Sequence, residues 1–283
     1  MKKFALVLGV CSLALVLILS SGCGKAKSTI IQIKGSDTLI NLVQKLSESY
    51  MAANPRQQIA VTGGGSGTGI ASLINNECDV ANASRAMSDS EIKQAEAKGI
   101  NPKAVNIAID GLSIITNASN PVKQLTVEQL GKIFKGEITN WKQVGGKDGT
   151  ITLYGRQSNS GTFVFFREHV LKGDYSQNMR QMNGNSQIVE SVKQDPTGVS
   201  YVGVSYAKNA TGINVLSIAQ TEKDTYFSPL NSADVKSGKY PISRPLNQYV
   251  NGKASVAVQK FIDFELSVAG QKIVEEEGFV TIK

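Results

Sequence analysis

Short apolar runs alternate with amphipathic segments along most of the chain, and polar turns join them. The β-branched run at residues 29–33 predicts a strand, and the spacing of apolar residues after it predicts a helix. The same order recurs over residues 59–75 and 79–98. The apolar face of the first helix consists of Leu39, Leu42, Val43, Leu46 and Tyr50. Such alternation indicates an α/β fold with a parallel-type sheet and helices on its faces.

A second series of strands and helices follows, in which Thr126 and Gln129 form a capping-box pattern at the start of a helix. The further expected strands lie at residues 105–109, 112–116, 151–154, 198–204, 214–218 and 245–250, and the further helices at 126–134, 163–170 and 255–269. A chain of 283 residues is long enough for two domains with cores of their own.

The N-terminus has a different pattern. It begins with Met1-Lys2-Lys3, continues with an almost unbroken apolar run from Phe4 to Leu19, and then has small residues. This layout is typical of a secretory signal, since the run is slightly short for a membrane span and no basic cluster follows it. A retained anchor helix is the alternative.

The end of this run resembles a bacterial lipobox, whose cysteine is lipidated and becomes the first residue of the mature chain. Cys23 stands at that place, and Ser20 stands where lipoboxes usually have Leu. We therefore expect a lipoprotein signal peptide at 1–22, a short tether at 23–28, and an exported protein that is lipid-anchored to the outer face of the cell membrane or lies in the periplasm. An ordinary cleavage site before a free cysteine is the alternative.

Cysteine usage and charge narrow the class of protein further. With Cys11 removed in the signal and Cys23 acylated, Cys78 has no partner for a disulfide, and its apolar neighbours favour a buried, inert thiol. The formal net charge of +7 falls by two charges when Lys2 and Lys3 leave with the signal. Because the lysines are spread along the chain without interleaved aromatic residues, we expect no nucleic-acid binding. Small anions or an anionic membrane surface fit this charge.

Three turns between a strand and a helix carry the same chemistry. They are Ser-Asp-Thr at 36–38, a glycine-rich stretch with Ser66 and Thr68 at 63–69, and Ser-Asn-Ser-Gly-Thr at 158–162. The first N–H groups of a helix lack partners and glycine lets an anion approach them, so such turns bind oxyanions. Helix capping alone explains any one of them. Because ligands of open α/β sheets collect at the carboxyl ends of strands, three such turns indicate one shared anion.

Nucleotide binding and catalysis have weaker support. The glycine-rich stretch lacks the lysine of a P-loop, and no register of it gives G-x-G-x-x-G, which favours a small tetrahedral anion. The single histidine, His169, follows an aromatic run in a helix, and there is no G-x-S-x-G, no H-E-x-x-H and no carboxylate cluster with metal-ligand spacing. We expect no enzyme activity, cofactor or metal. A phosphatase is the alternative from another class.

The turns resemble those of the phosphate-binding protein of high-affinity phosphate ABC transporters, and the likeness extends from Ile31 to about Val280. Thr38 and Ser66 stand at the Thr and Ser of that family's first two turns. Residues 156–162 match its Arg-x-x-x-Ser-Gly-Thr segment, which is the most specific of these motifs.

The resemblance implies a two-lobed periplasmic-binding-protein-like fold of type II, in which each lobe is a sheet flanked by helices and phosphate lies in the interlobe cleft. With the return strand at 245–250, it places lobe one at 29–113 plus 246–283 and lobe two at 114–245. It also implies delivery of inorganic phosphate to the permease subunits of an ABC transporter, and we expect a monomer. Binding of sulfate, molybdate or tungstate, or a role as the ligand-presenting subunit of a sensor, are the alternatives.

The proton acceptor cannot be transferred from the family. One branch has an Asp that accepts the proton of hydrogen phosphate where this chain reads Ala83-Ser84-Arg85, and an acidic residue where it has Ser158. A buried carboxylate accepts that proton but repels fully ionised sulfate. Asp37 and Asp110 are the candidates, and we favour Asp110 because it ends an apolar strand just before the expected hinge. A simple Asp-Gly hinge turn is its alternative.

Two arginines stand near these turns. Arg156 is expected to bind phosphate through its planar fork, whereas Arg85 is either a phosphate ligand or the partner of Glu91. The candidate ligand residues are Ser36, Thr38, Ser66, Gly67, Thr68, Ser84, Arg85, Asp110, Arg156, Ser160, Gly161 and Thr162.

Overall fold

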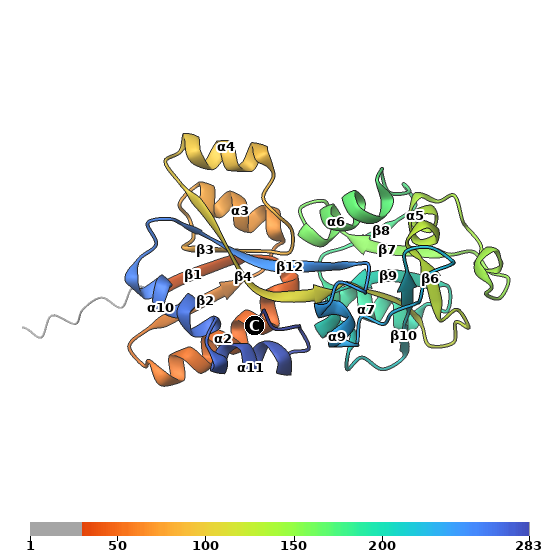
Figure 1. The fold of residues 1–283 in the computed structure, drawn as a ribbon. Coiled ribbons are helices and arrows are strands. Elements are labelled where there is room, and N and C mark those ends of the chain that lie inside the picture. The colour runs from red at the N-terminus through yellow and green to blue at the C-terminus, as the bar shows by residue number, and fades with distance from the viewer. Residues whose placement is uncertain (1–29, 283) are drawn as a thin grey trace, which may run out of the picture.

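The computed structural model describes residues 30–282, whose strands form two five-stranded sheets and one two-stranded sheet. Figure 1 shows these sheets in two lobes that lie side by side, each with helices on its faces. The expected two-lobed α/β fold is confirmed. The predicted signal peptide, the lipidation at Cys23 and the tether lie outside the described residues. Within residues 30–282, no helix combines the length and apolar character needed to cross a membrane.

The first lobe is built on a sheet with the strand order β2-β1-β3-β12-β4. Its strands are β1 (Ile30–Gly35), β2 (Gln58–Thr62), β3 (Val80–Ala83), β4 (Pro102–Gly111) and β12 (Ser243–Asn251). Its helices are α2 (Ile40–Ala53), α3 (Ser66–Ile74), α4 (Asp89–Ala97), α10 (Val256–Glu265) and α11 (Val268–Glu276). β1 pairs in parallel with β2 and β3, but β12 runs antiparallel to β3 and β4. The sheet is therefore mixed rather than purely of the predicted parallel type.

The second lobe is built on a sheet with the order β10-β5-β9-β7-β8. Its strands are β5 (Ser113–Asn117), β7 (Thr152–Arg156), β8 (Arg180–Met182), β9 (Gly198–Val202) and β10 (Ile213–Val215), and β6 (Gln124–Thr126) pairs with β11 (Ser217–Ala219) beside them. Its helices are α5 (Val127–Lys135), α6 (Gly161–Phe166), α7 (Asn185–Gln194), α8 (Val204–Ala207) and α9 (Ser232–Lys236). A 3-10 turn, η2 (Trp141–Val144), and a π-helical turn, η3 (Arg167–Leu171), complete it.

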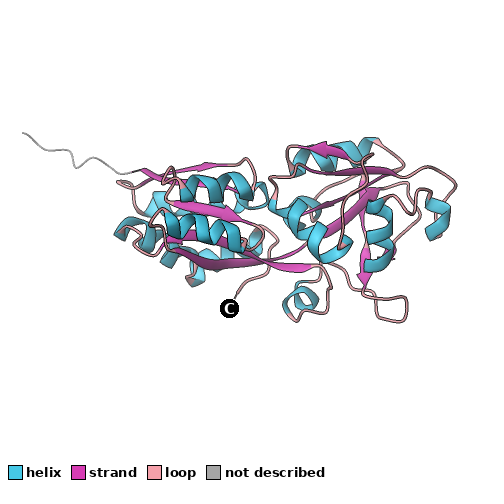
Figure 2. Cartoon of the chain, turned by 90° about the horizontal axis from the view of Figure 1, so that it is seen from above, coloured by secondary structure: helices cyan, strands magenta, loops and turns pink. Residues whose placement is uncertain are grey.

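The chain crosses between the lobes at two neighbouring strands. β4 leads through Leu112 into β5, and β12 returns beside β4 with Arg244 opposite Asp110. Figure 2, seen from above, shows the two lobes joined along these strands. The residue boundaries given above for the two lobes remain a prediction.

Each lobe has its own apolar core. In the first lobe, α2, α10 and α11 pack on one face of the sheet and α3 and α4 on the other (Figure 1). The predicted helix face is confirmed, because Leu39, Leu42, Val43, Leu46 and Tyr50 are all buried in this core. In the second lobe, the rings of Phe134, Phe166 and Tyr201 pack together, with centroids 4.4–5.5 Å apart. These cores hold the strand ends and helix starts in fixed positions.

The predicted capping box at Thr126 is present. The Thr126 hydroxyl accepts from the backbone N–H of Gln129 at 3.1 Å, and the Gln129 side chain accepts from the N–H of Thr126 at 2.9 Å. α5 therefore starts where the sequence predicted it.

Three expected elements differ from the structure. The helix expected at 255–269 is two helices, because the Ser267 hydroxyl caps α11 and a Cβ at Gly270 would lie 2.3 Å from the Phe264 carbonyl oxygen. The strand expected at 214–218 divides at the buried Leu216, so that β10 joins the second sheet and β11 pairs with β6. The strand expected at 198–204 ends at Val202, and α8 begins at Val204.

Candidate functional site

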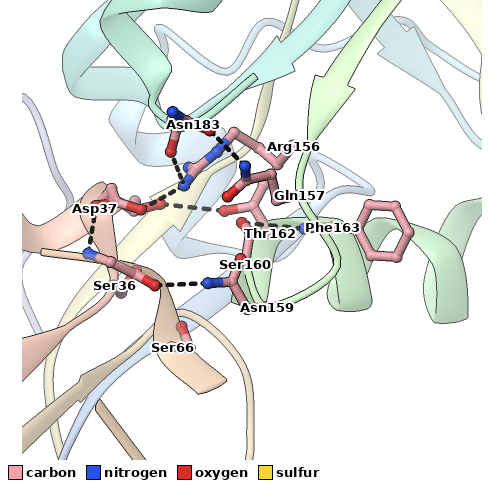
Figure 3. A network of polar contacts seen from close by, with 12 residues as sticks. Ser36, Asp37, Ser66, Arg156, Gln157, Asn159, Ser160, Thr162, Phe163 and Asn183 are labelled. Atoms are coloured by element: carbon pink, nitrogen blue, oxygen red, sulfur yellow. Dashed lines mark hydrogen bonds and ion pairs between the residues drawn. The ribbon is translucent and has the colours of Figure 1, made fainter. Parts of the chain in front are cut away.

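The three hydroxyl-bearing turns meet between the two lobes. Ser36 follows β1 and precedes the 3-10 turn η1 (Asp37–Leu39), Ser66 is the first residue of α3, and Ser160 caps α6 of the second lobe. Figure 3 shows Ser36, Asp37 and Ser66 on one side and Arg156, Ser160 and Thr162 on the other, where Asp37 and Arg156 are in direct contact. Each turn comes at the carboxyl end of a strand, where an α/β sheet places its ligands.

Hydroxyl groups from both lobes form one buried cluster. Thr38 Oγ1 lies 3.1 Å from Thr162 Oγ1, and Ser84 Oγ lies 3.5 Å from the same atom. Ser36 donates to Ser84 Oγ at 3.0 Å, and Ser66 Oγ lies 3.4 Å from it. We call these five side chains the hydroxyl cluster. The cluster thus joins α6 of the second lobe to three turns of the first.

Glycine makes this close approach possible. A Cβ at Gly161 would lie 2.3 Å from Ser66 Oγ and 2.8 Å from Ser84 Oγ, so any larger residue would separate α6 from the first lobe.

Backbone N–H groups orient two hydroxyls of the site, those of Ser66 and Ser160. The backbone N–H of Ser84 donates to Ser66 Oγ at 3.0 Å, and the N–H of Phe163 donates to Ser160 Oγ at 3.4 Å. A hydroxyl has one proton, so a hydroxyl oxygen that accepts from an N–H keeps its own proton for another acceptor. This arrangement suits a ligand that is rich in acceptor oxygens.

Arg156 lies beside the cluster at the end of β7. Its Nη2 donates to the carboxylate of Asp37 in the first lobe and, at 2.9 Å, to the carbonyl of Asn183 (Figure 3). Its Nε is buried and has no hydrogen-bond partner among the described residues. A buried N–H without an acceptor is costly, and an anion would supply that acceptor.

Two further candidates, Gly67 and Thr68, form hydrogen bonds outside the hydroxyl cluster. The N–H of Gly67 donates to the carbonyl of Asn159 at 2.9 Å, and the Thr68 hydroxyl donates to the carbonyl of Gly64 at 2.7 Å. The Asn159 side chain also donates to Gly64 at 2.8 Å. These contacts tie the glycine-rich turn to the second lobe.

Arg85 is not drawn into the hydroxyl cluster by any hydrogen bond among the described residues. Instead its two terminal nitrogens each donate to Glu91 at 2.7 Å. Of the two roles that the sequence left open for Arg85, the structure therefore has the ion pair with Glu91. These hydrogen bonds hold the pKa of Arg85 above its usual range. The Nε of Arg85 is buried without a partner in the described part of the chain.

Asp110 is fully buried and is already paired. Its Oδ2 accepts from Nε and Nη2 of Arg244 at 3.1 and 2.9 Å, and its Oδ1 accepts from the N–H of Val204 at 2.9 Å. It lies close to the cluster, since a Cβ at Gly203 would be 2.8 Å from Thr38 Cγ2 and 3.6 Å from each Asp110 oxygen. A carboxylate can accept about four hydrogen bonds, and Asp110 already accepts those from Arg244 and Val204. It therefore keeps some capacity to accept a further hydrogen bond.

Sequence reasoning missed Arg244. This residue comes just before the return strand expected at 245–250, and no motif marks it. Besides Asp110, its guanidinium donates to the Ser84 carbonyl at 3.0 Å and to Thr162 Oγ1 at 3.0 Å, and it lies 5.2 Å from the centre of the Phe165 ring. Burial lowers the pKa of Arg244, and Asp110 opposes that shift.

Two other titratable side chains, Cys78 and His169, make no hydrogen bond with the hydroxyl cluster among the described residues. Cys78 is buried and burial raises its pKa to about 12, which fits the inert thiol that we expected. His169 stacks on Phe165, with Nδ1 3.0 Å from the Phe165 carbonyl oxygen. Among residues 30–282, no three His, Cys, Asp or Glu side chains gather as a metal site would require.

Two α/β lobes joined by two crossing strands, with polar groups of both lobes meeting between them, define a two-lobed solute-binding protein. A profile of the PBP superfamily domain matches residues 24–268. The phosphate-binding protein PstS of Pseudomonas aeruginosa is 31% identical over 88% of this chain and 81% of its own, and PstS of Borreliella burgdorferi is 33% identical over 90% of each. The chain belongs to this family of phosphate-binding proteins within the PBP superfamily.

Solved structures agree with this placement. A substrate-binding protein of a phosphate ABC transporter from Clostridium perfringens, with bound phosphate, superposes with a TM-score of 0.80 at 29% identity, over 90% of this chain and all of that one. An ABC-type phosphate transport receptor from Vibrio cholerae gives a TM-score of 0.72 at 29% identity, over 89% of this chain and 99% of that one.

Proposed function

We propose that this protein captures inorganic phosphate between its two lobes outside the cytoplasm and delivers it to the permease subunits of an ABC importer. The observation that carries the proposal is the hydroxyl cluster, in which side chains from both lobes meet beside the buried Arg156. The phosphate-binding family to which the chain belongs supports the same ligand.

The proposed ligands supply donors from both lobes. Thr38, Ser66 and Ser160 donate through their hydroxyls, and Thr162 and Arg156 donate from the second lobe. Ser36, Ser84, Gly67, Gly161 and Thr68 line the same region, whereas Arg85 has weaker support because Glu91 occupies its fork. Donors with oriented protons bind a tetrahedral oxyanion through several charge-assisted hydrogen bonds.

We propose that a carboxylate selects hydrogen phosphate, with Asp110 as the first candidate and Asp37 as the second. Asp37 accepts from the N–H of Gly64 at 2.9 Å and from Arg156, so it too retains acceptor capacity. A buried carboxylate favours an anion that carries a proton and repels one that does not.

Calorimetric titration of one ligand-free preparation with phosphate and with sulfate tests the ligand. We expect saturable phosphate binding at a single site and much weaker sulfate binding. Tighter binding of sulfate than of phosphate would indicate that the protein binds another oxyanion. Turnover of a phosphomonoester by the same preparation would instead favour a phosphatase.

We further propose that residues 1–22 are removed and that Cys23 carries the lipid that anchors the protein outside the cell membrane. In a membrane-fractionation experiment, Cys23→Ser should move the protein from the membrane fraction to the soluble extracytoplasmic fraction. Small-angle scattering should show a monomer whose radius decreases with saturating phosphate, because lobes of this kind close around a ligand by hinge motion. An unchanged radius would count against closure.

A further inference from the structure

The guanidinium of Arg244 donates hydrogen bonds to groups on three different parts of the site. It lies on β12, where the chain returns to the first lobe, and its side chain is 1% exposed. Its guanidinium contacts Asp110 on β4, the Ser84 carbonyl after β3, and Thr162 on α6 of the second lobe. It therefore links the crossing strands to the hydroxyl cluster.

The hydrogen bond from Arg244 to Thr162 has only one possible direction. A guanidinium stays protonated and has no acceptor, so Nη2 donates to Thr162 Oγ1 at 3.0 Å. Thr162 must then direct its own proton elsewhere, toward Thr38 Oγ1 or Ser84 Oγ, at 3.1 and 3.5 Å. Arg244 thereby sets Thr162 as a donor at the point where the two lobes meet.

The position of Arg244 is itself fixed from several sides. Asp110 accepts from both Nε and Nη2, and Asp110 is in turn held by the N–H of Val204 at the start of α8. The Phe165 ring lies against the guanidinium at 5.2 Å. These contacts use the planar fork of arginine, which a lysine cannot reproduce.

We propose that Arg244 is a positioning residue of the phosphate site, which acts by fixing the Thr162 hydroxyl as a hydrogen-bond donor to the anion. This inference rests on the proposed phosphate binding. Arg244 differs in this from Arg156, whose buried Nε is free to contact the anion directly.

A double-mutant cycle tests the inference with phosphate as the titrant. Arg244→Lys keeps a cation beside Asp110 but loses the fork, and Thr162→Val keeps the shape of the side chain but loses the hydroxyl. Each single variant should bind phosphate roughly tenfold to a hundredfold more weakly, the range for one lost charge-assisted hydrogen bond. The double variant should bind no more weakly than the weaker single variant, since both changes remove the same donor.

Two backgrounds separate positioning from general damage to the fold. In Thr162→Ser, which retains the hydroxyl, Arg244→Lys should weaken binding as it does in the wild type. In Ser160→Ala, whose hydroxyl shares no hydrogen bond with Arg244 among the described residues, the two losses should multiply. Arg180→Lys is the matched control, because Arg180 also donates to a side-chain oxygen and lies over an aromatic ring, that of Tyr154, but outside the cluster.

The possible outcomes are distinct. Equal losses from Arg244→Lys in the Thr162→Val and Thr162→Ser backgrounds, or no loss at all, would overturn the positioning role. If Arg244→Lys does not fold, Arg244→Met with Asp110→Leu replaces the pair by apolar residues. Because Asp110 is itself a proposed ligand, the quantity compared is then the further effect of Thr162→Val, which should be small in this background and roughly tenfold or more in the wild type. If the wild type itself does not bind phosphate, the proposed function fails, and the cycle then has no wild-type affinity to compare.

Discussion

Two carboxylate–guanidinium pairs flank the hydroxyl cluster, and they differ in where they lie. Asp37 and Arg156 come from different lobes, and their side chains are 13% and 2% exposed. Asp110 and Arg244 stand opposite each other on neighbouring strands of one sheet, and their side chains are 0% and 1% exposed. The first pair separates when the lobes separate, whereas the second moves with the crossing strands.

This difference assigns the two pairs different roles. A pair between lobes can stabilise the closed arrangement and can exchange its partner for a ligand, as the buried, unpartnered Nε of Arg156 suggests. A fully buried pair within a sheet is costly to form and very costly to break, because removal of one partner leaves an uncompensated charge. We therefore propose that the first pair takes part in ligand exchange and that the second belongs to the framework that orients the site.

The largest expected effect is a difference between the two pairs in their contribution to the free energy of unfolding. Asp110→Ala should lower the free energy of unfolding of the ligand-free protein by roughly 3–5 kcal/mol, because Arg244 is left buried without a counter-ion. Asp37→Ala should lower it by about 1 kcal/mol or less, because Arg156 gains water when the lobes open. Denaturant titration measures both, and similar losses in the two variants would remove the distinction.

The hydroxyls between the pairs should control binding rather than stability. Thr38→Ala, Ser66→Ala and Ser160→Ala should each weaken phosphate binding by roughly 1–3 kcal/mol, the range for a lost charge-assisted hydrogen bond. Calorimetry measures the change, and Ser191→Ala on α7, whose hydroxyl donates only to the Gln187 carbonyl among the described contacts, serves as control. If all three variants bind like the wild type, the anion lies elsewhere.

Glu265 is a buried carboxyl that, unlike Asp37 and Asp110, accepts no hydrogen bond from an arginine among the described residues. Gln248 donates to its Oε1 at 3.1 Å, and its Oε2 has no partner among the described residues. Burial raises its pKa well above the usual value, and Gln248 opposes that shift. The folded state therefore holds the proton more tightly than the unfolded state, so stability falls as the pH rises from about 4.3 to the folded-state pKa.

Unfolding curves at several pH values check this direction. Relative to Glu265→Gln, the wild type should lose stability with rising pH by up to about 1.4 kcal/mol per unit within that window. Glu128→Gln on the surface of α5 is the control. Parallel curves for the wild type and Glu265→Gln would show that Glu265 titrates normally.

The smallest expected effect concerns selectivity. Asp110→Asn should lower the ratio of phosphate to sulfate affinity, because the amide no longer repels a fully ionised oxyanion and can donate as well as accept. Both affinities are measured at one pH and one salt concentration. Asp195→Asn is the control, because the Asp195 carboxylate accepts hydrogen bonds from Tyr154 and Thr197 and from no member of the hydroxyl cluster among the described residues. A ratio that does not move in a folded variant would leave Asp110 as the partner of Arg244 and pass the acceptor role to Asp37.

The local signals in the sequence were reliable where neighbours along the chain decide the structure. The capping box at Thr126 and the apolar face of α2 depend on residues within one or two helical turns, and both are present. The expected helix at 255–269 was wrong because its break depends on the Ser267 cap and on the close approach at Gly270, which the apolar spacing does not show.

The sequence alone determined the α/β class, the strand-to-helix turns that carry the hydroxyls, and the motif at 156–162 on which the resemblance to phosphate-binding proteins rested. Only the tertiary structure decided which charges meet. Asp37 and Arg156 are 119 positions apart, and Asp110 and Arg244 are 134 apart. The antiparallel register of β12 beside β4 sets Arg244 opposite Asp110, and Asp37 meets Arg156 where α6 contacts the first lobe. The sequence predicted the return strand at 245–250, but no local pattern encodes its register beside β4, so the sequence marked Asp110 and gave no sign of the arginine that holds it.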